Sequence, residues 1–400
     1  MSAEYWVWLQ QVLGYGNTAV SRVIAEYGTA EGFYRANDSE KIARCRLNKS
    51  QISRLHSIPR KNVYKILQDS AKSGINIITP EDSLYPERLL NISNPPAVLY
   101  VKGSRFDFNG KPAIAIVGPR KISDYGANCA YVIANTLASC GFTVVSGGAI
   151  GGDSMAHKGA IDAKGYTVGV LGSGIDSSYL KTNEKLRNEI SQNGCLVSEY
   201  PPFKGVTKAS FPIRNRIVSG LCNGVVVVEG GEKSGTLITA RHAAEQGRDV
   251  FVIPGSPSLP QYMGSNRLIA DGARPLLDVN EIINEYYFLY PKTIHKPKHT
   301  VPVYEKGAIP ETKDIAPSEK QTEKSEPKEE CRVTAKPDKN MLSDEALKVL
   351  EFFETIGDTF IIDDAAGAVG MSIGTLLGVV TELEICGFIE AVPGGRYRLK

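Results

Sequence analysis

Short apolar runs alternate with helix-periodic segments through the middle of this 400-residue chain. The runs are rich in Val, Ile and Leu without polar alternation, which is typical of strands buried on both faces of a parallel sheet. The segments between them have the length of crossover helices. The predicted strands are 113–117, 143–145, 167–171, 195–197, 225–228 and 250–253, and the predicted helices are 124–139, 153–163, 182–191 and 237–246. This order predicts an α/β fold with an extended Rossmann-like, mostly parallel sheet over residues 76–290.

A small helical domain is predicted before this core, over residues 1–75. Residues 7–13 and 18–27 form two apolar-periodic segments joined by Gly14-Tyr-Gly16. Two short helices around a Gly-x-Gly turn resemble a helix-hairpin-helix or SAM-type domain, in which turn amides can meet a DNA phosphate. A tight corner between two helices explains so short a pattern equally simply, and we favour that interpretation.

Two further segments are predicted after the core. Residues 291–338 are rich in Lys, Glu, Pro, Thr and Ser and bury too little apolar surface to offset the entropy of ordering, so they predict a flexible linker. Residues 339–400 carry three helix-like segments and a final pair of short strands, the order of a winged helix. The third of these helices has few basic residues, which favours protein contact over DNA readout by this domain.

Composition narrows the functional class. Hydrophobic residues make up 42% of the chain, charged residues 22%, and the formal net charge is +2, so any anion-binding site must be local. The seven cysteines are scattered without a C-x-x-C pair, so neither a metal site nor a disulfide framework is expected, and the compartment predicted is a reducing cytoplasm. Neither a secretory signal nor a membrane-spanning run is apparent, and no membrane partner is expected.

Candidate chemistry lies in loops that follow the predicted strands. Because the carboxyl ends of parallel strands meet at one edge of a sheet, five glycine- or cation-bearing loops are expected to converge on a single rim. Exposed amides, a helix N-terminus and arginine side chains all favour phosphate there. The predicted phosphate-contacting residues are Gly118, Arg120, Ser146, Gly147, Gly148, Gly151, Gly152, Gly172, Gly174, Lys181, Lys185, Arg214, Asn215, Arg216, Ser234, Gly235, Thr236 and Asn266.

Some members of this set have an alternative role. Arg214 and Arg216 flank an asparagine just before a helix-like segment, and both are expected to reach the rim. Asn266 is expected to pin a loop rather than to do chemistry. Asp153 and His157 stand four apart on a predicted helix, and a structural hydrogen bond between them is preferred to a metal or acid–base pair, because no third ligand is in reach.

Catalysis is not supported by these loops. The chain has no Walker A loop, no G-x-G-x-x-G with a ribose-binding acid, and no G-x-S-x-G or suitably placed Cys–His pair. We therefore expect binding rather than an enzymatic reaction, with no cofactor.

Seven motifs together resemble the DNA-processing protein A (DprA/Smf) family of single-stranded-DNA-binding recombination mediators. The resemblance is dense over about residues 85–285. The motifs are Ile116-Val-Gly-Pro-Arg120, Ser146-Gly-Gly-Ala-Ile-Gly-Gly-Asp-Ser-Met-Ala-His157, Gly169-Val-Leu-Gly-Ser-Gly-Ile-Asp176, Ser198-Glu-Tyr-Pro-Pro202, Phe211-Pro-Ile-Arg-Asn-Arg-Ile217, residues 229–239 and Gly247-Arg-Asp-Val-Phe-Val-Ile-Pro-Gly255. Three departures stand out: Pro119 replaces a usual serine, which removes a candidate phosphate hydrogen bond, and Gly152 and Leu180 replace a usual isoleucine and proline.

The resemblance implies a Rossmann-like core that forms a homodimer, binds single-stranded DNA and helps to load the RecA recombinase during natural transformation and recombination. Single-strand-binding protein is a further candidate partner. By position, Arg120 matches the family's DNA-contacting arginine, and either Lys181 or Lys185 matches its partner lysine. The flanking helical domain and the winged helix are similar to the family's accessory domains.

Two other functions stay open. Phosphoribohydrolases of the nucleotide-binding Rossmann class carry a loop similar to 230–236, and such a hydrolase would need a catalytic acid, for which Glu229, Glu232 or Asp153 could serve. The chain could instead sense a free nucleotide and signal through its winged helix. Steep salt dependence would favour the DNA interpretation, with Tyr125, Tyr179 and Phe203 as candidates for base stacking.

Overall fold

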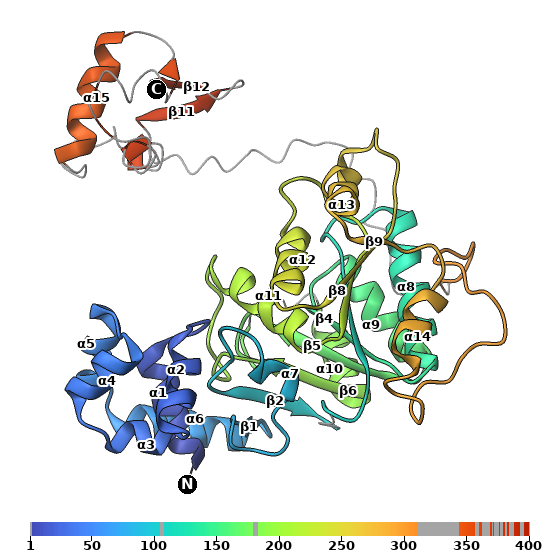
Figure 1. Cartoon of the computed structure of the whole chain (residues 1–400), viewed down its shortest axis with the longest axis horizontal. Coiled ribbons are helices and arrows are strands. Elements are labelled where there is room, and N and C mark those ends of the chain that lie inside the picture. Colours follow the sequence, from blue (N-terminus) through green and yellow to red (C-terminus); the bar gives the residue numbers. More distant parts are fainter. Residues whose placement is uncertain are drawn as a thin grey trace. The chain divides into compact units, whose positions relative to one another are not determined.

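The structure is a computed structural model, and the chain in it divides into two compact units, Met1–Glu311 and Thr312–Lys400 (Figure 1). It describes residues 2–104, 108–178 and 183–309 of the first unit. In the second unit it describes 344–356, 360–361, 388–392 and 396–399, with seven single positions between 369 and 383.

One nine-stranded sheet forms the centre of the first unit. Its strands are β1 (Asn76–Ile78), β2 (Leu99–Gly103), β3 (Ala113–Val117), β4 (Thr143–Ser146), β5 (Tyr166–Leu171), β6 (Gly194–Ser198), β7 (Gly224–Val227), β8 (Asp249–Val252) and β9 (Arg274–Pro275). Their spatial order is β1-β2-β6-β5-β4-β3-β7-β8-β9. Only the β1–β2 and β2–β6 pairs are antiparallel. The predicted α/β fold with a mostly parallel sheet is confirmed.

Helices cover both faces of this sheet, and the alternation of strand side chains decides which core each residue joins. In β3, Ile114 and Ile116 pack with α8 (Asp124–Ser139), α9 (Gly152–Asp162) and α14 (Asn280–Tyr287), whereas Ala115 and Val117 face the opposite way. On that second face lie α7 (Glu87–Leu90), α11 (Ser210–Gly220), α12 (Gly235–Glu245) and α13 (Pro260–Ala270).

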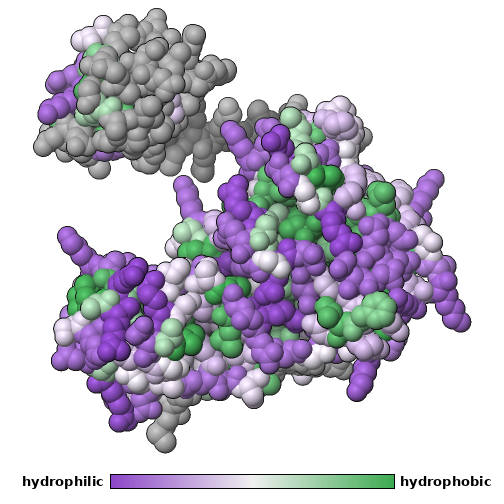
Figure 2. Space-filling model, viewed as in Figure 1, coloured by the Kyte–Doolittle hydropathy of each residue, from purple (hydrophilic) through white to green (hydrophobic). Residues whose placement is uncertain are grey.

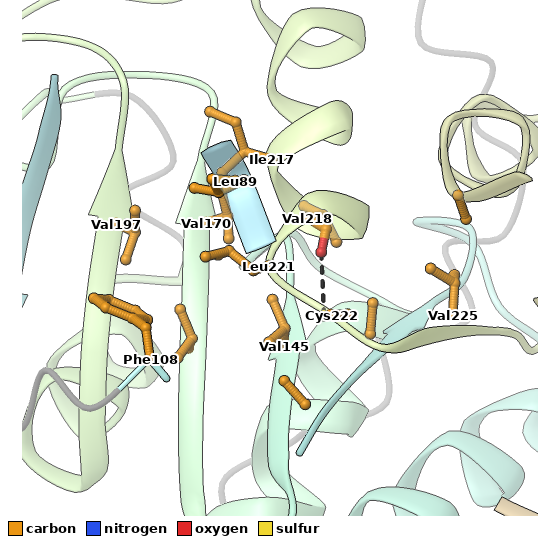
Figure 3. Close-up of a cluster of buried hydrophobic side chains, with 14 of the residues drawn as sticks. Leu89, Phe108, Val145, Val170, Val197, Ile217, Val218, Leu221, Cys222 and Val225 are labelled. Carbon is orange, nitrogen blue, oxygen red and sulfur yellow. Dashed lines mark hydrogen bonds between the residues drawn. The ribbon is translucent and has the colours of Figure 1, made fainter. Parts of the chain in front are cut away.

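The second face carries the helix that matters for the site, α11. Figure 3 shows Ile217 and Val218 of α11, and Leu221 just after it, packed over Val145 of β4 and Val170 of β5. Cys222, just past the end of α11, donates a hydrogen bond from its thiol to the carbonyl of Val218 at 3.2 Å. Each fully buried aliphatic side chain of this kind contributes on the order of 1.5–3 kcal/mol to stability, so these contacts hold α11 in a fixed position on the sheet.

Six helices precede the sheet and dock onto its β2–β6 side (Figure 1). They are α1 (Ser2–Leu13), α2 (Ala19–Tyr27), α3 (Ala30–Arg35), α4 (Asp38–Cys45), α5 (Lys49–Ser57) and α6 (Arg60–Lys72). Gln10 of α1 donates to the carbonyl of Glu199 at 2.9 Å and accepts from the hydroxyl of Tyr100 at 3.0 Å. The docking surface therefore contains buried polar contacts as well as apolar side chains.

The Gly14-Tyr-Gly16 turn belongs to this docking surface. The amide of Gly16 donates to a carboxylate oxygen of Glu199 at 3.2 Å, and the ring of Tyr15 lies 4.5 Å from that of Tyr200. Because the turn amide is already bonded within the chain, it is not presented to a DNA phosphate. The structure supports the simple corner between two helices over the helix-hairpin-helix interpretation.

The segment after α14 departs from the predicted linker. Ile294 and Val303 are buried against the core, and the amide of Val279 donates to the carbonyl of Val301 at 2.9 Å. A linker beginning at residue 291 is therefore wrong, because residues up to about 305 pack on the α8–α14 side. The remainder of the predicted linker, from residue 310, lies outside the described residues.

The second unit begins with α15 (Asp344–Ile356), whose buried residues include Val349, Leu350 and Phe353. Its strands β10 (Phe360–Ile361), β11 (Ile389–Val392) and β12 (Arg396–Leu399) form an antiparallel sheet in the order β10-β12-β11. Most of the second and third helices predicted for the winged helix fall outside the described residues. Among the helices described in both units, none combines the length and apolar character needed to cross a bilayer.

Candidate nucleic-acid interface

A cleft of about 280 Å³ opens at the carboxyl ends of the adjacent strands β4, β3 and β7. Its walls come from the loop after β3, the loop after β4, one side of α11 and the first turn of α12. Eight predicted residues line it: Gly118, Arg120, Gly147, Arg214, Asn215, Ser234, Gly235 and Thr236. Three of the five predicted loops therefore do converge on one rim.

The loops after β3 and β4 are packed directly on each other. A Cβ on Gly152 would lie 2.7 Å from the Cα of Gly118, and one on Gly151, which has φ +84°, would lie 2.3 Å from the carbonyl oxygen of Pro119. The amide of Gly152 donates to that same carbonyl at 3.1 Å. Gly151 and Gly152 thus allow close backbone approach between the loops, and neither lines the cleft.

The anion-binding amides predicted after β4 are partly taken by the chain's own Asp153. The amide of Ala149 donates to this carboxylate at 3.4 Å, and Ser146, which is fully buried, donates instead to the carbonyl of Ile116 at 2.7 Å. Burial raises the pKa of Asp153, while the nearby charge of Arg214 and the loop amides oppose that rise. Ser146 is therefore corrected from a phosphate ligand to a structural residue.

Two arginines place positive charge in the cleft at different depths. Arg214 is 7% exposed, and its Nη1 donates to the carbonyls of Gly147, at 2.7 Å, and Val170. Its Nε has no hydrogen-bond partner among the described residues. Arg120 is exposed at the mouth, with its guanidinium 5.2 Å above the ring of Phe211. Burial, together with the like charge of Arg120, lowers the pKa of Arg214, so an anion between them would relieve the repulsion.

The first turn of α12 adds a helix N-terminus to the same wall. Ser234 is the N-cap, and its hydroxyl accepts from the amide of Thr236 at 3.3 Å. Asn215 of α11 reaches across to the carbonyl of Gly235 at 3.4 Å. A Cβ on Gly235 would meet no atom of the described residues within 4 Å, so this part of the chain leaves room for a ligand there. The dipole of the 11-residue helix favours a negative charge at this point.

Arg216 does not reach the cleft, and its predicted phosphate contact is wrong. Its side chain is only 2% exposed, and its Nη2 lies 2.7 Å from Glu199. The remaining donors bond the carbonyls of Asn94, at 3.1 Å, and Ile213, at 3.0 Å. Every one of these partners lies within the protein. Glu199 also accepts from the amide of Gly16, so Arg216 is linked to the docked N-terminal helices through Glu199.

The remaining predicted residues lie elsewhere. A Cβ on Gly172 would contact the ring of Phe211, and one on Gly174 would lie 2.0 Å from the carbonyl of Pro201, so both glycines serve packing. Gly148 takes a positive φ of 68° and does not line the cleft. Lys185 is exposed in the first turn of α10 (Glu184–Asn193), and Lys181 lies outside the described residues.

Asn266 pins a loop, as the sequence predicted. It accepts from the amide of Gly255 at 3.3 Å and donates to its carbonyl at 3.0 Å. It lines a separate hollow of about 860 Å³ between α12 and α13, where Figure 2 shows hydrophobic surface gathered. A direct phosphate contact by Asn266 is therefore not supported.

The predicted hydrogen bond between Asp153 and His157 is not formed. The Nδ1 of His157 lies 2.8 Å from the hydroxyl of Thr167, which itself donates to the carbonyl of Val144. His157 is fully buried, and this burial, with the charge of Arg214 second, lowers its pKa to about 3. It is a neutral core residue beneath the loop after β4.

The three acids considered for a hydrolase differ in placement. Glu229 is buried and accepts hydrogen bonds from the amide and hydroxyl of Ser123, at 3.1 and 2.7 Å, and from the hydroxyl of Tyr262 at 3.1 Å. It thereby fixes the start of α8. Glu232 lines the separate hollow between α12 and α13, and only Asp153 of these three lines the cleft. Phe211 was overlooked as a site residue, although its place beside Arg214 in the sequence could have indicated it.

Comparison with known proteins identifies the family. The profile of the family described as DNA recombination-mediator protein A matches residues 76–287, just over half of the chain. The chain belongs to this family. It is 32% identical to Protein Smf of Escherichia coli over 365 residues, which cover 91% of this chain and 88% of that protein. It is also 40% identical to the DNA processing protein DprA of Bacillus subtilis over 221 residues, or 55% and 74% of the two chains.

A solved structure of the same family has the same fold. The X-ray structure of DNA processing protein A (DprA) from Streptococcus pneumoniae is 30% identical and has a TM-score of 0.64, with 71% of this chain and 98% of that chain covered. Family membership gives the chain a recombination-mediator role in DNA processing.

Proposed function

We propose that the cleft binds the backbone of single-stranded DNA and that the chain acts without catalysis, presenting the strand to the RecA recombinase. The observation that carries this proposal is Arg120, whose guanidinium is exposed at the mouth of a cleft that also contains a second, buried arginine. Arginine is suited to phosphate because its donors form a planar fork that binds two oxygens at once.

The chemistry of the walls favours a backbone over a base sequence. The cleft offers Arg120, Arg214, the amide side chain of Asn215 and the N-terminus of α12, all of which can meet phosphate oxygens. Contacts of this kind position a nucleic acid without reading its sequence. Binding should therefore be general for single strands and should weaken as salt rises, because each neutralised phosphate releases counterions.

The steps after DNA binding are proposed from the family rather than from the cleft. As a recombination mediator, the chain would hand its strand to RecA, in competition with single-strand-binding protein. A homodimer would double the number of clefts and allow one strand to run between two copies. The exposed edge strand β9 and the partly apolar hollow beside α13 support a self-contact on that side of the sheet.

The first experiment measures fluorescence anisotropy of labelled oligo-dT and of a matched duplex over a series of salt concentrations. The wild-type chain should prefer the single strand, and Arg120→Ala should lose affinity by about tenfold or more, with a salt slope smaller by about one. Arg35→Ala is the matched control, because Arg35 is an exposed arginine of the N-terminal helices, paired with Glu31 on one helix. Equal binding of duplex, or an unaffected Arg120→Ala, would contradict the proposal.

Recombinase loading needs a separate assay. RecA added to oligo-dT coated with single-strand-binding protein should form filaments faster in the presence of the wild-type chain than with Arg120→Ala.

Incubation with nucleoside monophosphates tests the hydrolase alternative. Release of a free base that is abolished in Asp153→Asn would favour that enzyme over the DNA-binding proposal.

A further inference from the structure

Three tyrosine rings form a ladder that leads from the protein interior to the surface. Tyr262 is buried, at 3% exposure, and its ring centroid lies 6.3 Å from that of Tyr125, edge-on at 70°. Tyr125 is 37% exposed and is stacked at 5.5 Å and 25° against Tyr304, which is 42% exposed. We call these three residues the tyrosine ladder.

The inner end of the ladder is bonded to the start of α8. The hydroxyl of Tyr262 bonds Glu229 at 3.1 Å and lies 2.9 Å from the hydroxyl of Ser123, the N-cap of α8. Tyr125 follows in the first turn of α8, five residues after Arg120. Five residues span at most about 17 Å, so the ladder lies within a few nucleotides of the phosphate site.

The outer ring is not required to anchor the segment that carries it. On one side of Tyr304, Val303 is buried in the core. On the other side, the side chain of Asn128 donates to the carbonyl of Glu305 at 2.8 Å and accepts from its amide at 3.1 Å. Because both neighbours are fixed independently, the backbone holds the Tyr304 ring out toward solvent in a defined place.

The charges around the ladder suit a base better than a phosphate. Lys121 and Lys306 are exposed nearby in sequence, but so are the carboxylates of Asp124 and Glu305. These acids would repel a phosphate placed at the ladder itself. An uncharged aromatic group meets no such repulsion, and base–aromatic stacking tolerates any of the four bases.

From this placement we infer that the outer face of Tyr304, backed by Tyr125, stacks a nucleobase of the DNA strand whose phosphate lies in the cleft. The inference depends on the proposed function and extends it, since it adds a base platform to a site otherwise made of phosphate contacts. It also assigns a role to Tyr304, which lies beyond the matched family region of 76–287.

The test compares oligo-dT with an oligonucleotide of the same length and charge whose deoxyribose units carry no bases. Tyr304→Ala should weaken oligo-dT binding on the order of tenfold and leave binding to the abasic strand unchanged. Tyr304→Phe keeps the ring and should bind oligo-dT as the wild type does. Tyr64→Ala, which removes a 46% exposed tyrosine of α6, is the matched control and should be without effect.

The outcomes of this test distinguish the stacking inference from the proposed function, which is binding of single-stranded DNA. If the wild-type chain binds oligo-dT and Tyr304→Ala binds it with the same affinity, the stacking inference is overturned and the proposed function is not. An equal loss on both strands would overturn it too, because the ring would then act through the fold rather than through a base. Failure of the wild-type chain to bind oligo-dT at all would overturn the proposed function, and the inference with it.

Discussion

Arg214 and Arg216 stand two residues apart on α11 and serve opposite sides of the molecule. Arg214 lines the cleft, where its Nε has no hydrogen-bond partner among the residues that the structure describes. Arg216 is paired with Glu199 and two carbonyls, and Glu199 also accepts from the amide of Gly16 in the docked N-terminal helices. Residues two apart on a helix point in nearly opposite directions, so one helix positions the cleft and secures the N-terminal helices at the same time.

Removal of Arg216 should have the largest effect on the fold. Arg216→Ala leaves the Glu199 carboxylate buried without its cation, and the free energy of unfolding should fall by about 3–5 kcal/mol. Urea denaturation followed by circular dichroism measures this loss. Arg35→Ala, at an exposed ion pair, should change stability by less than about 1 kcal/mol. A loss of stability no larger than in that control would contradict a structural role for Arg216.

Removal of Arg214 should instead lower the affinity for DNA. Arg214→Gln takes the buried cation from the cleft, and the affinity for oligo-dT should fall by about 1.5–3 kcal/mol, the range for hydrogen bonds to charged groups. Arg214→Lys keeps the charge and should lose less. Anisotropy titrations at one salt concentration measure both. If Arg214→Gln binds DNA normally while Arg216→Ala, assayed at a temperature where it is folded, does not, the assignment of the two faces is reversed.

Acid should destabilise the cleft side through His157. The folded pKa of this buried imidazole is about 3, and the unfolded value is near 6.5, so below pH 6.5 the unfolded chain takes up the proton and the folded chain does not. Stability contributed by the neutral ring is therefore present above pH 6.5 and is lost as pH falls toward 3. Between pH 7 and pH 5 the loss should be about 2 kcal/mol.

Urea midpoints at pH 7 and pH 5 test this, with His157→Gln as the variant that cannot titrate. The difference between the two pH values should be smaller in His157→Gln than in the wild type. Asp153 acts in the opposite direction at lower pH, because burial raises its pKa and its folded form holds a proton longer. An identical pH response in both chains would show that His157 is not the group responsible.

The smallest effect is expected at the turn that touches α11 from the N-terminal side. Gly16 has φ +64°, and a Cβ there would lie 2.8 Å from a methyl group of Ile213. Gly16→Ala should cost about 1–2 kcal/mol from the left-handed backbone, with little added by Ile213, whose side chain can move. Thermal unfolding measures this loss of stability. Gly28→Ala is the control, because Gly28 also has a positive φ but a Cβ there meets no described atom within 4 Å, so it reports the backbone effect without the contact.

The sheet could be predicted because its strands are uninterrupted apolar runs, and the rim followed from the rule that parallel strands end at one edge. The arginines could not be assigned while Arg214-Asn-Arg216 was taken to precede a helix. Once the segment is known to lie inside α11, the helical period alone separates the two side chains. Pro212 obscured this, yet it lies in the first turn, where a helix tolerates proline.

Other errors came from partners that are distant in sequence. His157 bonds Thr167 rather than Asp153, and Asp153 occupies amides that the glycines after β4 were expected to offer to a ligand. The sequence predicts Gly151 and Gly152 as part of an anion-binding loop, whereas in the structure their missing side chains allow the backbone to approach Pro119 and Gly118 closely. A single sequence shows that glycine is present, and not which neighbouring backbone requires it.

The polar contacts around Glu199 have a consequence for how this sequence can diverge. Its carboxylate accepts hydrogen bonds from Arg216 and from the Gly16 amide. If the N-terminal helices were lost, Glu199 and Arg216 would become exposed to solvent. A substitution of either residue alone would leave the other without its charged partner. Among descendants of this chain, we expect positions 199 and 216 to change together, and to do so in those lineages that have shed residues 1–75.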